Sequence, residues 1–358
     1  MKRRWKILLG LVGTALVAAA TPVVWIATAC TSPVRGIAPQ GYHGQLSGGD
    51  TRPEAQTWLT YPEWHIVYST ESIARHLAAG KRPSAYPYLS DIGGFWSSYC
   101  QVNRIARQAG GSDQYSVVID TIGISYSAEL LVKAAWENTV GRLFERLSGW
   151  TSTDDRHAAE VMTRYGAFMH ETPWYRFSFG EALRDEWWTS ETDQVARHWE
   201  RRIALSLEYG VKAGYAKLIG WATGTAMGAD EVRLRLLLRP GQANLAAIVP
   251  DAKVLGETAG VVKLDLPRYA RFTQIVLALA QTDAEIVEIA GNDDVMLTLL
   301  VPDAARQRLS SGPLVIDMPL GDRPGWRRLG ISAKAPALLQ MLRAAQASGA
   351  EVEHVYDY

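Results

Sequence analysis

The feature that most constrains this chain is an uncharged segment close to its N-terminus. Four basic residues within "MKRRWK" precede Ile7–Ala29, a run of 23 residues without a charged side chain. A run of about 18 or more apolar residues can cross a bilayer, whereas the apolar region of a signal peptide has about 7–15 residues. Basic flanking residues stay on the cytoplasmic side. The sequence therefore predicts that the chain after residue 30 lies outside the cytoplasm.

Three interpretations of this segment remain open. Residues 1–30 can be an uncleaved membrane anchor. The small residues before Cys30 in "ATAC" also allow a lipoprotein cleavage site that would leave Cys30 lipidated, and Pro22 could divide a signal peptide that is removed altogether. All three predict an extracytoplasmic body, in the periplasm or at the cell surface. We expect it to be tethered to the membrane through residues 7–29.

Composition divides the rest of the chain into three parts. Residues 31–54 are rich in Gly, Pro, Ser and Thr and are interpreted as a linker. Residues 55–228 hold ten of the 13 Trp and eleven of the 15 Tyr, and their pattern predicts an aromatic-rich helical domain with an aromatic core. Residues 229–358 alternate strand-like and helix-like segments. They predict an α+β domain of ferredoxin-like order, with "GNDD" as a hairpin turn.

Capping residues and stop signals predict the helices of residues 55–228. The expected starts are Thr60, Ser90 or Asp91, Asp113 or Ser116, and Thr153, and the last helix is expected to end at Gly228. The segment "EWHIVY" after Thr60 is interpreted as helix, although its alternation also allows a short strand.

Two of these helices carry the same pattern, a Glu followed four residues later by a Lys. The matching faces consist of Glu129, Lys133 and Trp136 in the first helix and of Glu208, Lys212 and Tyr215 in the second. Each pair allows three interpretations: a solvent-facing ion pair, a partly buried polar cluster, or a ligand-binding or catalytic site. In the second interpretation, stripes of small residues bring the two helices together.

The glycine spacing within residues 203–228 also allows a second membrane span. Glu208 and Lys212 would then lie at bilayer depth, at a cost of several kcal/mol. Tight packing within a soluble bundle is the preferred interpretation.

Other candidates for chemistry carry weaker signals. Glu63 and His65 could form an acid–base pair if "EWH" is a strand. His198 and Glu200 lie among arginines in "RHWERR", where ordinary surface residues are the simpler interpretation. Cys100 has no candidate base nearby in the sequence and is interpreted as a small buried hydrophobic residue.

Charge and motif content exclude several classes of function. The chain has 37 Lys and Arg against 37 Asp and Glu, so its formal net charge is zero, which argues against a nucleic-acid partner. Two cysteines are too few for a disulfide scaffold or a thiolate zinc site. No metal or cofactor motif of recognised spacing occurs, so neither a metal nor a cofactor is predicted.

The stretches "TYPEWHIVYSTES", "GFWSSYC", "WENTVGRL" and "WERRIALSLEYGVKAGY" together resemble a family of bacterial membrane-anchored proteins for which no activity is known. The similarity covers about residues 55–228 and, more loosely, "GAEVEHVYDY" at the C-terminus. It implies a location in the bacterial envelope and no residue roles.

These observations lead to two hypotheses of different classes. The first is a membrane-tethered protein whose helical domain binds a protein partner or a small apolar ligand. The alternative is an envelope enzyme that acts on a glycan or lipid with carboxylates as acid and base, for which Glu63, His65, Glu129 and Glu208 are the candidates. A hollow that gathers these side chains would favour the enzyme.

Overall fold

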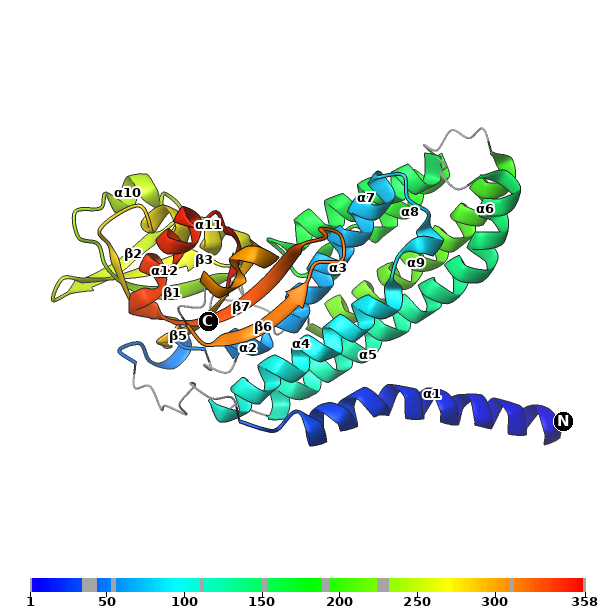
Figure 1. Cartoon of the computed structure of the whole chain (residues 1–358), viewed down its shortest axis with the longest axis horizontal. Coiled ribbons are helices and arrows are strands. Elements are labelled where there is room, and N and C mark those ends of the chain that lie inside the picture. The colour runs from blue at the N-terminus through cyan, green and yellow to red at the C-terminus, as the bar shows by residue number, and fades with distance from the viewer. Residues whose placement is uncertain are drawn as a thin grey trace.

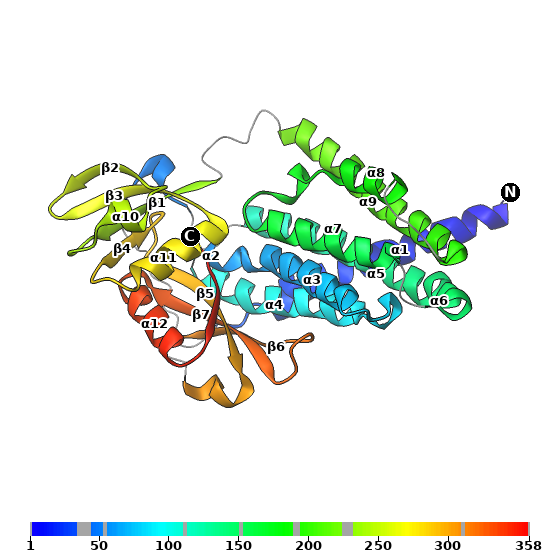
Figure 2. The same ribbon diagram turned by 90° about the horizontal axis from the view of Figure 1, so that it is seen from above.

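The computed structural model has three parts, namely an N-terminal helix, a bundle of long helices, and an α+β domain at one end of the bundle (Figures 1 and 2). It describes residues 2–33, 44–52, 56–109, 113–149, 153–188, 194–223, 232–308 and 312–356.

The uncharged N-terminal segment forms one continuous helix, α1 (Lys2–Ala29). Pro22 lies inside this helix and does not interrupt it. The last turn of α1 packs against α4 (Tyr88–Gln108), where Ile26 and Cys30 are buried. Towards its N-terminus, α1 diverges from the bundle on the side where α5 lies, while α7 lies on the opposite side (Figure 1).

The bundle contains eight α-helices among the described residues. They are α2 (Gln56–Leu59), α3 (Tyr61–Ala78), α4, α5 (Asp113–Trp136), α6 (Arg142–Ser148), α7 (Thr153–Met169), α8 (Phe179–Trp188) and α9 (Val195–Thr223). A π-helical turn, Glu137–Gly141, joins α5 to α6. The 3-10 turns are η1 (Gly48–Asp50), η2 (Pro83–Ala85) and η4 (Trp174–Arg176). α3 packs against α4 and α7, α4 against α5, and α8 against α9.

Most helix boundaries agree with the capping signals. α5 begins at Asp113, α7 at Thr153, and α3 directly after Thr60. "EWHIVY" is helical. The buried residues of α3 include Tyr61, Trp64 and Tyr68, which recur at the three- and four-residue spacing of a helix and not at the two-residue spacing of a strand. The expected helix end at Gly228 lies outside the described residues.

Aromatic side chains fill the interior of the bundle. Trp58, Tyr61, Phe95, Tyr99 and Tyr209 are almost fully buried. Phe95 contacts Tyr99 and other aromatic rings edge-on or tilted, at centroid distances of 5.3–6.4 Å. The aromatic richness of residues 55–228 therefore serves packing first, as the sequence predicted.

The α+β domain consists of two units with the same order of elements. The first contains β1 (Arg233–Arg239), α10 (Leu245–Ile248), β2 (Lys253–Thr258), β3 (Val261–Pro267), α11 (Tyr269–Leu279) and β4 (Glu285–Ile289). The second contains β5 (Asp294–Pro302), the 3-10 helix η6 (Asp303–Arg308), β6 (Leu314–Pro319), β7 (Trp326–Lys334), α12 (Ala335–Ala347) and β8 (Glu351–Val355). The sheet orders are β2-β3-β1-β4 and β6-β7-β5-β8.

The two sheets share their irregularities as well as their order. The ladder β1–β4 shifts register after Leu237, and the ladder β5–β8 shifts after Thr298. A second shift follows Val254 in β2–β3 and Leu314 in β6–β7. Because a bulge is tied to one position in a strand, these matches indicate that the second unit is a structural repeat of the first.

The predicted grouping of the strands after Val261 into one sheet is wrong, because the structure divides them between two sheets, whereas the predicted β–α–β–β–α–β order of elements occurs in the first unit. β3 and β4 belong to the first sheet, while β5, β7 and β8 belong to the second. The turn after β4 has positive φ at Ala290 (49°) and Gly291 (88°), and it leads β5 into the second sheet instead of closing a hairpin. Strand-like patterns reveal strands but not their partners, and the error came from that limit.

Equivalent positions of the two sheets contact different parts of the chain. In the first sheet, Glu288 accepts hydrogen bonds from the backbone N–H groups of Gln45 (2.6 Å) and Leu46 (2.9 Å). In the second sheet, His354 occupies the equivalent position, and its ring lies 3.7 Å from that of Trp64 in α3. The second sheet therefore attaches the α+β domain to the bundle.

Candidate functional site

The two Glu/Lys patterns meet in the structure, but mainly across the helices. Lys133 of α5 lies 2.9 Å from Glu208 of α9, and Lys212 of α9 lies 2.8 Å from Glu129 of α5. Lys212 is also 3.5 Å from Glu208 on its own helix. We call these four residues the crossed cluster. Its formal charges cancel.

Three members of the crossed cluster are largely withdrawn from water. The side-chain exposure is 14% for Lys133, 12% for Glu208, 15% for Lys212 and 41% for Glu129. The Lys212 ammonium also faces the rings of Tyr165 and Phe179, 5.2 and 5.6 Å from their centroids. Such contacts stabilise a cation that has lost part of its hydration. The cluster therefore matches the partly buried interpretation better than the solvent-facing one.

The small-residue stripes do not join these helices. A Cβ added at Gly210 or Gly214 would meet no atom within 4 Å. Ser127 and Ser206 instead accept hydrogen bonds from the indole N–H groups of Trp96 and Trp187, both at 2.9 Å. The prediction of close backbone packing between the two helices is wrong, because long charged side chains span the distance between α5 and α9.

Between residues 195 and 215, α9 buries several charged side chains and exposes large apolar ones, although Leu205 and Tyr209 are buried as well. Its exposed residues from 195 to 215 are all uncharged, and the large ones follow each other at four-residue intervals: Val195, Trp199, Ile203, Leu207, Val211 and Tyr215. Its buried face contains Arg197, His198, Glu200 and Arg201. This is the reverse of an amphipathic helix on the surface of a soluble protein.

The outer face of α5 continues this uncharged surface. Val117, Val118, Leu131 and Val132 are exposed, and between residues 117 and 135 the one exposed charged residue is Glu129, a member of the crossed cluster. We call the combined exposed surface of α5 (residues 117–135) and α9 (residues 195–215) the apolar face.

The opposite side of the bundle is an ordinary solvent-facing surface. α7 exposes Arg156, Glu160 and Arg164, and it buries Val161 and Met162 among its apolar residues. α8 exposes a charged residue in each of its first two turns. The two sides of one bundle therefore differ in chemistry.

Two aromatic candidates lie outside the crossed cluster. The Trp136 indole N–H donates to Glu200 at 2.6 Å. The Tyr215 ring packs 5.5 Å from Trp174 at the other end of α9. The sequence placed both on one face with the Glu/Lys pairs, but each is held by another partner.

Trp136 belongs to an enclosed ion network that sequence reasoning missed. Arg201 lies 2.8 Å from Glu137 in the π-helical turn and 2.5 Å from Glu200. Arg197 lies 2.7 Å from Glu200 and 3.1 Å from Asp155 at the start of α7. All five charged members of this network are buried. The signal was present in "RHWERR", where residues 197, 200 and 201 share one face and Trp199 lies on the other.

Beside this network, Glu186 of α8 is fully buried. Burial, reinforced by the neighbouring Asp154, raises the pKa of Glu186 to about 8. The carboxyl of Asp154 forms a hydrogen bond with His198 Nδ1, at a distance of 2.7 Å. The interface of α7, α8 and α9 is therefore a second polar interior.

Glu63 and His65 do not form an acid–base pair. Both lie on the helix α3, where residues two apart point in different directions. Glu63 accepts a hydrogen bond from the Tyr115 hydroxyl at 3.1 Å, and burial raises the pKa of Glu63. His65 Nε2 lies 3.1 Å from the backbone oxygen of Asp91, and burial lowers the pKa of His65 to about 4.

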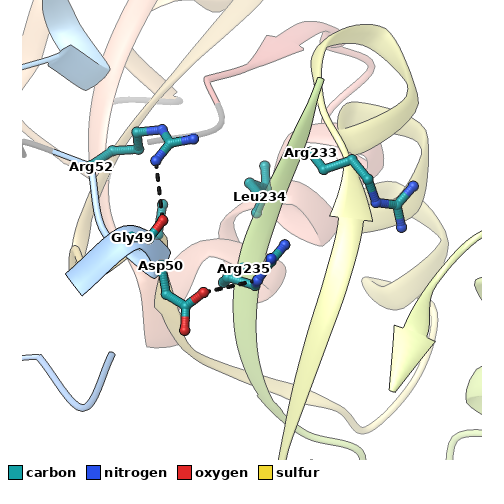
Figure 3. A pocket seen from close by; sticks show the side chains of 7 residues that line it. Gly49, Asp50, Arg52, Arg233, Leu234 and Arg235 are labelled. Atoms are coloured by element: carbon teal, nitrogen blue, oxygen red, sulfur yellow. Dashed lines mark hydrogen bonds and ion pairs between the residues drawn. The ribbon is translucent and has the colours of Figure 1, made fainter. Parts of the chain in front are cut away.

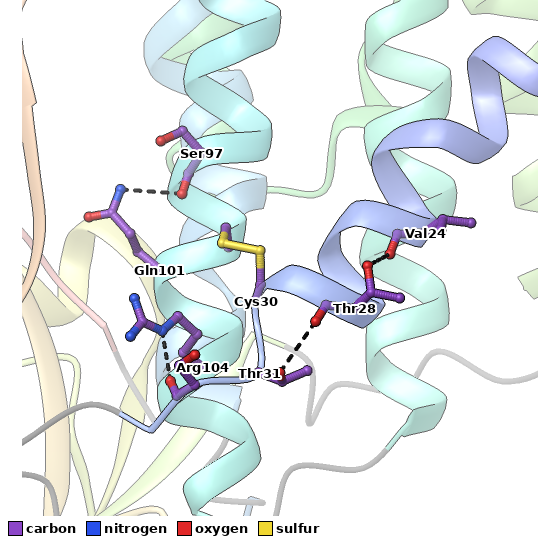
Figure 4. Close-up of a disulfide and its surroundings, with 9 residues drawn as sticks. Val24, Thr28, Cys30, Thr31, Ser97, Gln101 and Arg104 are labelled. Carbon is purple, nitrogen blue, oxygen red and sulfur yellow. Dashed lines mark hydrogen bonds between the residues drawn. A yellow bond between two sulfur atoms is a disulfide. The ribbon is translucent and has the colours of Figure 1, made fainter.

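The end of α1 is covalently joined to the bundle. Cys30 forms a disulfide with Cys100 of α4, 70 residues away in the sequence (Figure 4). Next to this bond, Arg104 Nε donates to the backbone oxygen of Ser32 at 2.7 Å. Cys100 is therefore a disulfide partner and not a simple buried hydrophobic residue. Lipidation of Cys30, one of the three alternatives that the sequence allowed, would need the same sulfur atom that forms this disulfide.

The hollows of the structure do not gather the predicted carboxylates. One is lined by Asp50, Arg52, Arg233 and Arg235 on the first sheet (Figure 3). Its Arg235 is paired with Asp50 at 3.0 Å, and Arg233 with Asp265 at 2.9 Å, so both arginines already have carboxylate partners. A second hollow on α7 and α8 is lined by residues including Arg156 and His157. Neither is lined by Glu63, Glu129 or Glu208.

Length and composition single out one described helical stretch, Tyr115–Ser148, as capable of crossing a membrane, and 22% of its most apolar window is buried. Ala19–Ala29 within α1 is apolar but shorter.

Within the described ranges, no group of three or more His, Cys, Asp and Glu is arranged to hold a metal. No protein-family model, curated protein or solved structure matches this chain.

Proposed function

We propose that this chain is a membrane-tethered protein of the cell envelope, with its bundle and α+β domain on the extracytoplasmic side. Its helical domain acts by binding through the apolar face and not by catalysis. α1 is the tether, and its basic N-terminal residues stay in the cytoplasm.

The disulfide between Cys30 and Cys100 is the observation that carries the location. Disulfides persist in the periplasm and outside cells and are rare in the reducing cytoplasm. Cys30 directly follows α1, so the disulfide lies immediately after the proposed membrane helix. The basic residues before α1 favour a cytoplasmic N-terminus, and the disulfide favours an extracytoplasmic position for Cys30. Both support the same topology.

The distribution of side chains supports binding over catalysis. The exposed surfaces of α5 and α9 are almost free of charge over many residues, and large apolar patches mark interaction sites. The carboxylates considered for acid–base chemistry lie apart: Glu63 is held inside by Tyr115, while Glu129 and Glu208 are neutralised by lysines. An enzyme would need such groups free and facing a common hollow.

The topology is tested by a reporter fused after residue 60, in cells that express the chain with α1 intact. The fusion is expected to be active only when the reporter requires the extracytoplasmic side. Alkaline extraction of the membranes should leave the chain in the membrane fraction. A reporter active only in the cytoplasm would overturn the proposal.

A matched pair of variants separates the tether from a lipid anchor. Cys30→Ser and Cys100→Ser both remove the disulfide, but only Cys30→Ser would remove an acylated residue. With α1 as the tether, both variants stay in the membrane and neither incorporates labelled fatty acid. If Cys30→Ser alone leaves the membrane fraction or loses a lipid label present in Cys100→Ser, the tether is a lipid and not α1.

A further inference from the structure

The exposed apolar residues of α9 raise the question of what the outer side of this helix contacts. Single exposed apolar residues are ordinary on soluble proteins, but long uncharged exposed faces on two ion-paired helices are not. From Val195 to Tyr215 the uncharged stripe extends over about 30 Å at 1.5 Å per residue. Polar residues that face a bundle interior while apolar residues face outwards are typical of helices in contact with lipid.

Exposed polar groups on α5 and on the π-helical turn after it donate hydrogen bonds within their own helical segment. The hydroxyl groups of Thr121 and Thr139 and the amide of Asn138 each donate to a backbone oxygen four residues earlier, at 2.6–2.8 Å. Thr21 and Thr28 of the tether α1 make the same bond at 2.7 Å. Each of these bonds satisfies one donor and lowers the cost of moving the group from water into hydrocarbon.

Aromatic residues of the kind found at membrane interfaces border the apolar face. Trp187 and Trp199 contact each other with ring centroids 6.0 Å apart, and the Arg202 guanidinium lies 5.1 and 5.6 Å from the two rings. Trp188 is 81% exposed. Trp and Tyr are enriched where the headgroups meet the acyl chains, because their rings are apolar and their N–H or O–H groups are polar.

The tether holds the bundle next to the bilayer on the matching side. The disulfide joins the residue after α1 to α4, so the bundle cannot separate from the end of the membrane helix. α1 leaves on the side of α5, and α7 with its exposed Arg156, Glu160 and Arg164 lies on the far side (Figure 1). The side chains that favour water therefore face away from the anchor.

We propose that the apolar face of α5 and α9 docks on the lipid bilayer that α1 crosses and contacts its acyl chains, while α7 and α8 face water. This inference rests on the membrane tether of the proposed function and names lipid as the ligand of the binding surface. The crossed cluster fits this role, because its two Glu and two Lys neutralise each other where the surface approaches hydrocarbon.

Spin labels on the full chain in phosphatidylcholine/phosphatidylglycerol vesicles test this docking. The sites are Leu207→Cys and Val132→Cys on the apolar face, with Glu160→Cys on α7 as the matched exposed control. Collision with oxygen, which dissolves in lipid, is compared with collision with a water-soluble nickel chelate. The ratio of oxygen to nickel accessibility is expected to be several-fold higher at residues 207 and 132 than at residue 160. Circular dichroism checks that each variant is folded.

Two other outcomes would overturn the docking. Equal ratios at residues 207, 132 and 160 would place the apolar face in water. Protection of residues 207 and 132 from both reagents would mean that a second copy or another protein covers the face. In either case the chain still sediments with the vesicles, whereas a chain that remains in solution would instead show that the tether itself is wrong.

Discussion

α7 and α9 are neighbours in one bundle, yet they are built in opposite senses. α7 buries apolar residues such as Val161 and Met162 and exposes Arg156, Glu160 and Arg164. α9 buries arginines and glutamates and exposes Ile203, Leu207 and their apolar neighbours. α7 has the distribution of side chains that the hydrophobic effect predicts for a helix with one side in water. The proposed docking places the outer side of α9 against lipid, and it accounts for the difference between the two helices.

The largest difference in stability between the two helices is expected for substitutions of their arginines. Arg201→Met removes one of the two arginines that contact Glu200 and leaves the buried Glu137 carboxylate without its ion-pair partner. We expect the free energy of unfolding to fall by about 3–5 kcal/mol. Arg164→Met on α7, whose side chain is 58% exposed, is the control and should cost less than about 1 kcal/mol. Denaturant unfolding measures both, and equal small losses would mean that the network contributes little.

The crossed cluster should show a smaller but coupled effect. Glu208→Gln leaves Lys133 and Lys212 without their shared carboxylate, and we expect a loss of about 1.5–3 kcal/mol. Glu129→Gln, at the more exposed edge, should cost less than about 1 kcal/mol.

The double variant of Glu129 and Glu208 decides whether the cluster acts as a unit. Because Lys212 contacts both carboxylates, the two losses should not add. Strictly additive losses, measured by thermal unfolding, would indicate two independent surface pairs.

The polar interior between α7, α8 and α9 should also respond to pH. The pKa of Glu186 is raised to about 8 in the folded protein, first by burial and then by Asp154, so the folded chain keeps a proton that the unfolded chain releases near pH 4.5. The stabilising contribution is complete below pH 4.5 and is lost as the pH rises through 8. We expect stability to fall over that window by about 1–3 kcal/mol.

Glu186→Gln should flatten this pH dependence, because the amide resembles the protonated carboxyl. Asp185→Asn, its more exposed neighbour, should leave the dependence unchanged. Unfolding midpoints across the pH range provide the measurement, and an unaltered slope in Glu186→Gln would show that Glu186 is ionised in the fold.

The smallest expected effect concerns the apolar face itself. In vesicles, Leu207→Gln brings an amide into contact with acyl chains, and we expect a loss of about 0.5–2 kcal/mol. Glu160→Gln on α7 should change stability by less than about 0.5 kcal/mol. If the two variants behave alike, α9 and α7 have the same surroundings.

The sequence predicted the helices of this fold better than its sheets. Thr60, Asp113 and Thr153 are local signals, and the helices begin at or next to them. The pairing of strands depends on contacts between distant segments, which no local pattern contains. The duplication in the α+β domain was missed for that reason, and the matching bulges of the two sheets reveal it.

The candidate site was predicted in composition but not in geometry. Glu129, Lys133, Glu208 and Lys212 do form one cluster, yet helix periodicity describes one helix at a time and favoured pairs along each helix. The pairing of Lys133 with Glu208 depends on how α5 and α9 lie next to each other. The reversed polarity of α9 could have been detected, since residues 197, 200 and 201 are charged on one face while 195, 199, 203, 207 and 211 are apolar on the other.

A cysteine scan along α9 and α7 tests the central claim most directly. Single cysteines replace residues 195–215 and 156–167 in turn, and a charged, membrane-impermeant maleimide reacts with the full chain in vesicles and then in detergent. On α7, the exposed positions should react fastest in both conditions. On α9, positions 203, 207 and 211 should be protected in vesicles and the protection should recur with the helical period. Fast reaction at these three positions in vesicles would contradict the account, because the apolar side of α9 would then face water.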